Sequence, residues 1–169
     1  TEDAQVQVVQ LPYKGDELSM MVVLPKAKDK IAMQRVVNTL NAKQISQWNN
    51  NLVKHEVILD LPKFKLEESY TMDSLLATMG MAKAFSSEAN FSLFSQNIPL
   101  SVDAIVHKAV VEVDEKGTKA AASTGISIVP MSLGYSMNTS TFTADHPFIF
   151  MIIDNKTDAI LFLGQVNEP

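Results

Sequence analysis

Residues 115–132 read EKGTKAAASTGISIVPMS, a segment in which two sets of side chains alternate. In steps of two from its fourth residue, the first set begins small and ends branched and apolar: Thr118, Ala120, Ala122, Thr124, Ile126 and Ile128. The residues between them are Lys119, Ala121, Ser123, Gly125, Ser127 and Val129. A repeat of two residues is the period of a β-strand, whereas Gly117, the polar run and Pro130 favour an exposed loop. The segment therefore suits two states, an exposed loop and a buried strand.

Further segments, spread along the chain, belong with this one: LPYKGDELSM at 11–20, LPKFK at 61–65, VHKA at 106–109, ADHPF at 144–148 and FLGQV at 162–166. Together with VDEKGTKAAA at 113–122, they resemble segments of the serpins, and they occur in serpin order. They cover essentially the whole chain, and an ordered series is far more specific than a lone motif. The resemblance implies an α+β serpin fold, with several mixed or antiparallel sheets and packed helices.

Serpins are more than twice the length of this chain, and the resemblance is to their C-terminal part. We therefore expect residues 1–169 to be the C-terminal portion of a single serpin domain, with no internal boundary. Thr1 is not an initiator methionine, which agrees with a missing start. The missing N-terminal serpin portion is then an expected partner. Any secretion signal would lie upstream of this chain, so the lack of one here decides nothing. From the resemblance we expect an extracellular rather than a cytoplasmic location.

The composition is that of an ordinary globular protein, 46% hydrophobic and 20% charged, which is enough for a core. No apolar run reaches the ~18 residues that a membrane span needs, so we expect no membrane partner. A net charge of −5 without a cluster of Lys and Arg argues against nucleic acid. The absence of cysteine excludes disulfides and thiolate metal sites.

Periodicity predicts strands at 5–11, 18–24, 57–61, 100–115, 142–153 and 159–166. Helices are predicted at 31–40 and 42–52, and from an N-cap at Thr71 to a C-terminal cap at Gly80. Ile45 and Trp48 are predicted core residues. Leu75, Leu76 and Met79 are predicted to form the buried stripe of the third helix. Because residues 100–115 are nearly apolar on both faces of a strand, we expect that strand to be buried in the centre of a sheet.

The sequence lacks the patterns of common catalytic and cofactor sites. It has no His-Glu-x-x-His spacing for zinc, no Gly-x-Ser-x-Gly elbow, and no Gly-rich phosphate-binding loop. We therefore expect neither a metal nor another cofactor, and we expect that the protein is not an enzyme.

The serpin resemblance implies that a target serine protease attacks the segment as a substrate. Counting seventeen residues from Glu115, as family loops run, ends at Met131, so the predicted reactive bond is Met131-Ser132. The protease would be trapped as a covalent acyl-enzyme on Met131 when the cleaved loop inserts into the central sheet, a suicide inhibition that requires a metastable fold. The predicted contacts with the protease pocket are Ile128, Val129, Pro130 and Met131. A medium-sized apolar side chain there favours an elastase-like or chymotrypsin-like target.

The resemblance also identifies a hinge, which consists of Glu115, Gly117, Thr118, Ala120, Ala121, Ala122, Ser123 and Thr124. The small side chains at 120–123 are expected to lower the barrier to insertion. Non-inhibitory serpins tend to carry bulky or charged residues or proline in this stretch. Lys119 is the one departure, at an outward-facing position. Protease inhibition is therefore the leading prediction. The alternative is a non-inhibitory serpin that acts as a carrier or a chaperone-like binder.

Two residues are predicted by the resemblance to control the opening of the sheet. One is His107, which from the sequence alone is more simply a hydrogen-bonded core histidine. The other is Lys63, whose match in serpins approaches the glutamate at the top of the hinge strand. That glutamate is Glu115 here, and we expect an ion pair that holds the hinge at its point of entry.

Overall fold

The computed structural model describes residues 3–115, 117–118 and 139–169. These residues form two compact units. The first comprises Thr1–Phe64 and Val113–Pro169, and the second comprises Lys65–Glu112. The prediction of a single domain without an internal boundary stays a prediction.

The elements, in chain order, are β1 (Val6–Pro12), β2 (Leu18–Pro25), α1 (Lys30–Thr39), α2 (Ala42–Asn50), β3 (Val57–Asp60), β4 (Phe64–Thr71), α3 (Asp73–Leu76), the π-helix η1 (Ala77–Met81), the 3-10 helix η2 (Ala82–Phe85), β5 (Val106–Asp114), β6 (Gly117–Thr118), β7 (Ser140–Thr143), β8 (Phe148–Asp154) and β9 (Ile160–Val166). The mixture of helices with several sheets confirms the predicted α+β class. None of the helices described here is long and apolar enough to cross a membrane.

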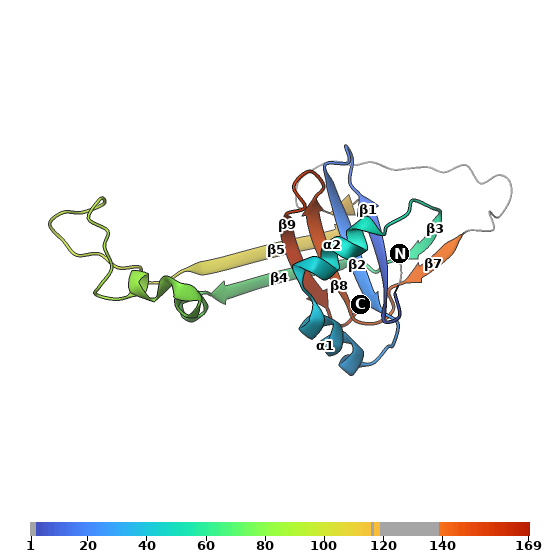
Figure 1. The fold of residues 1–169 in the computed structure, drawn as a ribbon, viewed down its shortest axis with the longest axis horizontal. Helices are drawn as coiled ribbons and strands as arrows, with labels where there is room; N and C mark the ends of the chain where they lie inside the picture. The colour runs from blue at the N-terminus through green and yellow to red at the C-terminus, as the bar shows by residue number, and fades with distance from the viewer. Residues whose placement is uncertain (1–2, 116, 119–138) are drawn as a thin grey trace. The chain divides into compact units, whose positions relative to one another are not determined.

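The first unit is built on a four-stranded antiparallel sheet in the order β1-β2-β8-β9 (Figure 1). Its two inner strands, β2 and β8, are long apolar runs, and nearly every residue in them is buried. Strands that are apolar on both faces need cover on both sides. The sheet therefore forms the centre of this unit.

Helices α1 and α2 cover one face of this sheet (Figure 1). Met33 and Val36 of α1 and Trp48 of α2 belong to one buried cluster with residues of β1, β2 and β8. Trp48 is 5% exposed and Ile45 packs against the cluster, so both predicted core residues are confirmed. Both helices begin at a residue whose side chain accepts a hydrogen bond from a backbone N–H of the first turn, which stabilises a helix start.

Phe64, at the start of β4, contacts two aromatic rings of β8. Its ring centroid lies 5.7 Å from that of Phe148 and 5.2 Å from that of Phe150. Opposite Phe150 in β9 stands Gly164. A Cβ atom at Gly164 would lie 2.5 Å from Cε1 of Phe150, so only glycine leaves room for this ring.

The second unit contains most of β4 and β5, which belong to a sheet of order β4-β5-β6, and the short helices α3, η1 and η2. The ion pair between Lys108 of β5 and Glu67 of β4 has an Nζ–Oε1 distance of 2.6 Å. Lys108 lowers the pKa of Glu67, first through their hydrogen bond and then through its charge.

The expectation of a buried strand at 100–115 is wrong in two respects. The strand begins only at Val106, and its side chains Val106 and Val110 are 66% and 41% exposed. The predicted buried stripe on the third helix is not buried either, since Leu75 is 51% and Met79 is 73% exposed and Leu76 is only half-buried. An apolar composition indicates that a face can be buried. Burial also requires another element that packs on this face. The described residues of this unit do not provide such an element for Val106, Val110, Leu75 and Met79.

Two predicted boundaries were also wrong. Thr71 is the last residue of β4, and the helix that follows is capped by Met72, without a side-chain hydrogen bond. The single strand predicted at 142–153 is two strands, β7 and β8, which belong to different sheets. The break falls at Ala144–Pro147, where Pro147 has no backbone N–H and so cannot donate a hydrogen bond to a neighbouring strand.

Candidate functional site

The start of the predicted hinge turns back on the strand that precedes it. β6 pairs with the end of β5 in antiparallel register, with Val113 opposite Thr118 and Asp114 opposite Gly117. Glu115 lies in the turn between the two strands. Residues 113–114 and 117–118 therefore form an antiparallel pair at the N-terminal side of the predicted reactive loop.

The predicted ion pair between Lys63 and Glu115 forms at this hairpin. Nζ of Lys63 lies 2.5 Å from Oε1 of Glu115, and both side chains are exposed. The hydrogen bond to Glu115, followed by its negative charge, raises the pKa of Lys63. The pair ties the turn after β5 to the segment just before β4.

The C-terminal side of the predicted loop is held by a parallel pair of strands. β7 runs beside β3, with Val57 opposite Ser140 and Asp60 opposite Thr143. The backbone N–H of Ala144 extends this pairing by donating to the carbonyl of Asp60 at 2.8 Å. Phe142, which is 4% exposed, anchors β7 in the interior of the unit.

His55 adds a side-chain contact at the beginning of this pair. Its Nδ1 lies 2.9 Å from the carbonyl oxygen of Val53, and its Nε2 lies 3.0 Å from Oγ of Ser140. A carbonyl only accepts, so in the neutral ring Nδ1 donates and Nε2 accepts from the Ser140 hydroxyl. Residues 55–63 therefore contact both sides of the predicted loop, at Ser140 and at Glu115. The sequence reasoning missed the contact with Ser140, since no local pattern links positions 55 and 140.

A hollow of about 700 Å³ lies in the first unit beside β1, the end of α2 and β7. Its wall mixes apolar groups with hydrogen-bonding ones, among them Gln10, Ser19 and Asn155. These three form a connected network: Gln10 Nε2 donates to Ser19 Oγ at 2.7 Å, and Ser19 Oγ donates to Asn155 Oδ1 at 2.7 Å.

The other predicted site residues are placed as follows. His107, predicted to act in sheet opening, is an exposed residue of β5 in the second unit, so it is not a buried core histidine among the residues that the structure describes. The reactive bond Met131-Ser132, the pocket contacts Ile128 to Pro130, and the hinge residues Ala120 to Thr124 lie outside the described residues. Within the described ranges, no group of three or more His, Cys, Asp or Glu side chains could hold a metal ion.

Comparison with known proteins agrees with this arrangement. The family model described as "Serpin (serine protease inhibitor)" matches residues 1–169. Serpin B4 of Homo sapiens is 42% identical over 99% of this chain and 43% of its own length. Intracellular coagulation inhibitor 2 of Tachypleus tridentatus is 42% identical over 98% of this chain and 40% of its own length. Leukocyte elastase inhibitor of Homo sapiens is 42% identical over 99% of this chain and 45% of its own length.

Solved structures give the same result. The thermophilic serpin tengpin in its native state matches with a TM-score of 0.80 and 32% identity, over 99% of this chain and 43% of its own. Thyroxine-binding globulin in complex with thyroxine matches with a TM-score of 0.77 and 31% identity, over 96% of this chain and 41% of its own. The chain therefore belongs to the serpin family. It spans less than half the length of each of these relatives.

Proposed function

We propose that this chain carries the reactive loop of a serpin that inhibits serine proteases of elastase-like or chymotrypsin-like specificity. The protease attacks Met131-Ser132 and is trapped as an acyl-enzyme when the cleaved loop inserts into the central sheet. The chain contributes no catalytic group of its own to this reaction, because the attacking nucleophile is the protease serine. The remaining N-terminal serpin portion and the protease are the proposed partners.

The observation that supports this proposal is the way the described residues hold the two sides of the loop. Glu115 is paired with Lys63 on one side, and β7 is paired with β3 on the other. A loop held at both sides by a packed unit can be presented to a protease in a fixed conformation, which lowers the entropy lost on binding. The relatives named as a leukocyte elastase inhibitor and a coagulation inhibitor favour the same function.

The decisive experiment substitutes one inward-facing hinge residue in the full-length protein. Thr118 is the first residue of the alternating set that becomes buried on insertion. Thr118→Arg would bury an unpaired guanidinium, which costs several kcal/mol even after relaxation. The reactive bond lies thirteen residues further on, so acylation continues while insertion slows. We expect cleavage at the same bond with little SDS-stable complex with an elastase.

Lys119→Glu is the matched control, because this neighbouring residue belongs to the outward-facing set. We expect it to leave the yield of covalent complex nearly intact. If the two variants gave equal yields, the inward and outward assignment would be wrong and insertion would lose its support. Mass spectrometry of the released peptide checks the bond, since the peptide should begin at Ser132.

A non-inhibitory carrier is the second candidate, and the hollow beside β1 and β7 favours it. The likeness to a thyroxine-binding globulin complex points in the same direction. A carrier would be cleaved by the protease without forming a covalent complex, and a small amphipathic probe would bind it with a saturable isotherm. An inhibitor would form the complex whether or not the probe is present.

The names of the relatives do not support the extracellular location expected from the sequence, and one relative is named as an intracellular inhibitor. Fractionation of the source cells and their medium, followed by detection of the full-length protein, would measure the location directly.

A further inference from the structure

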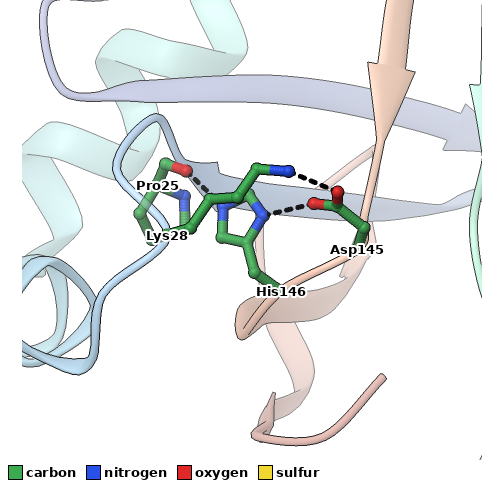
Figure 2. A network of polar contacts seen from close by, with 4 residues as sticks. All are labelled: Pro25, Lys28, Asp145 and His146. Atoms are coloured by element: carbon green, nitrogen blue, oxygen red, sulfur yellow. Dashed lines mark hydrogen bonds and ion pairs between the residues drawn. The ribbon is translucent and has the colours of Figure 1, made fainter.

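His146 is a buried histidine with two short polar contacts that the proposed inhibition does not use. It lies in the connection between β7 and β8 and is 8% exposed. Its Nε2 lies 2.6 Å from the carbonyl oxygen of Pro25, the last residue of β2. Its Nδ1 lies 2.7 Å from Oδ1 of Asp145 (Figure 2). Both ring nitrogens are therefore within hydrogen-bonding distance of an oxygen.

Both of these oxygens are acceptors. The carbonyl of Pro25 has no proton to donate. The hydrogen bond from His146, followed by that from Lys28, lowers the pKa of Asp145 to about 2, so its carboxyl group is an ionised acceptor at neutral pH. A neutral imidazole has one N–H and could donate to only one of the two, leaving a lone pair directed at the other. An imidazolium has two N–H groups and donates to both.

We propose that His146 is a positioning residue, held in the folded protein as an imidazolium that joins the end of β2 to the connection after β7. The protonation state is independent of the proposed function. The consequence for inhibition rests on that function, because β7 is the strand on which the predicted reactive loop ends. The ring holds the C-terminal anchor of the loop in place through two charge-assisted hydrogen bonds.

Two charged side chains act on the ring in this network. Asp145 favours the imidazolium because its carboxylate touches Nδ1 directly. Lys28, from the segment between β2 and α1, opposes added positive charge, but its ammonium group pairs with the other carboxylate oxygen of Asp145 (Figure 2). Asp145 therefore stands between the two cations and binds both.

Loss of one proton from His146 has a structural consequence. The neutral ring must give up either the contact with Pro25 or the contact with Asp145. Each of the two contacts is a hydrogen bond from the ring to an oxygen, so the loss of either one removes a link between the end of β2 and the connection after β7. That connection between β7 and β8 then loosens.

The first test is ¹⁵N NMR of the histidine rings in the full-length protein, with the His146 signals assigned by their loss in His146→Gln. We expect two protonated ring nitrogens at pH 7.5. In Asp145→Asn the second proton should leave at a lower pH, because the negative charge is gone. A single N–H on His146 at pH 7.5 would overturn the proposal, and this measurement needs no inhibitory activity.

The second test follows the rate constant for covalent complex formation with an elastase between pH 6 and pH 9. Each value is divided by the protease's own rate on a small peptide substrate, which removes the titration of the protease. We expect the ratio to fall roughly fivefold as His146 loses its proton, the effect of one lost hydrogen bond. His146→Arg, a permanent cation that only donates, should give a ratio that does not change with pH.

If the ratio stayed constant in the wild type while the NMR signal titrated, His146 would not position the loop. If no variant or pH altered complex formation because no complex formed at all, the proposed function would fail instead. The NMR result would still decide the protonation state. A failure of the proposed role of His146 can thus be distinguished from a failure of the proposed inhibitory function.

Discussion

The two units of this chain carry similar apolar sequences but bury them to different degrees. In the first unit, β2 and β8 are almost completely buried, with α1 and α2 packed on one face of their sheet and Phe64 in contact with Phe148 and Phe150. In the second unit, β5 and the helix that starts at Asp73 expose large apolar side chains. The hydrophobic effect acts only on surface that is removed from water. Burial therefore depends on whether a covering element exists, and the strand sequence alone does not provide it.

The largest expected effect contrasts one leucine from each unit. Leu24 in β2 is 3% exposed, whereas Leu93 in the second unit is fully exposed. Leu24→Ala should lower the free energy of unfolding by about 2–5 kcal/mol, because it leaves a cavity in a packed core. Leu93→Ala should stay within about 0.5 kcal/mol of the wild type. Urea unfolding curves measure both.

The same two variants also test whether the two units really differ in burial. If Leu93→Ala cost as much as Leu24→Ala in the full-length protein, a part of the protein outside these 169 residues would cover the second unit. The difference in burial between the units would then be a property of these 169 residues alone and not of the complete fold.

A smaller effect is expected at the contact between β9 and β8. Gly164→Ala places a methyl group 2.5 Å from Cε1 of Phe150, within a ring cluster that also contains Phe64. The overpacking should cost about 1–3 kcal/mol of unfolding free energy. Leu163→Ala is the matched control on the same strand, because Leu163 is 56% exposed and should change stability little. Equal losses for both would mean that β9 responds to strand propensity instead of packing.

The smallest effect concerns acid, and it compares a carboxylate of each unit. The pKa of Asp145 is lowered from 3.8 to about 2, first by the hydrogen bond from His146 and then by that from Lys28. A depressed pKa means that the stabilisation is complete above about pH 4 and is lost as the pH falls toward 2. We therefore expect Asp145→Asn to be less stable than the wild type at pH 7, and the difference to shrink to a small remainder by pH 2.

Glu67 of the second unit is the comparison for this acid effect. Lys108 lowers its pKa too, but both partners are exposed, and such pairs contribute little. Glu67→Gln should therefore change stability less than Asp145→Asn at pH 7. Thermal unfolding at several pH values between 2 and 7 would give the two differences. A larger effect of Glu67→Gln would show that the burial of His146 does not strengthen its interaction with Asp145.

Much of the architecture was predictable because it is written in local patterns. Periodicity over short stretches of sequence predicts the long apolar runs of β2 and β8 and the amphipathic spacing of α1 and α2. It also predicts the core position of Trp48. The pair between Lys63 and Glu115 was predictable by another route, from the resemblance to serpins, and the structure contains it.

The errors occurred where local pattern and tertiary packing differ. Residues 142–153 read as one apolar strand, but Pro147 ends the ladder and the connection around His146 sends the two halves to different sheets. A histidine between an aspartate and a proline, inside an apolar run, was a signal for this break that periodicity did not weigh. The contact between His55 and Ser140 had no such signal.

The sequence by itself determined the class of each main element, the family and the location of the segment that alternates between loop and strand character. These depend on residues close together in the chain, whose side chains repeat with a fixed period. Only the tertiary structure decided which apolar strands are buried, which residues hold the two sides of the loop, and that both nitrogens of His146 face acceptors. Those features depend on pairs such as Pro25 and His146, which are 121 positions apart, and folding brings them together through the packing of whole elements.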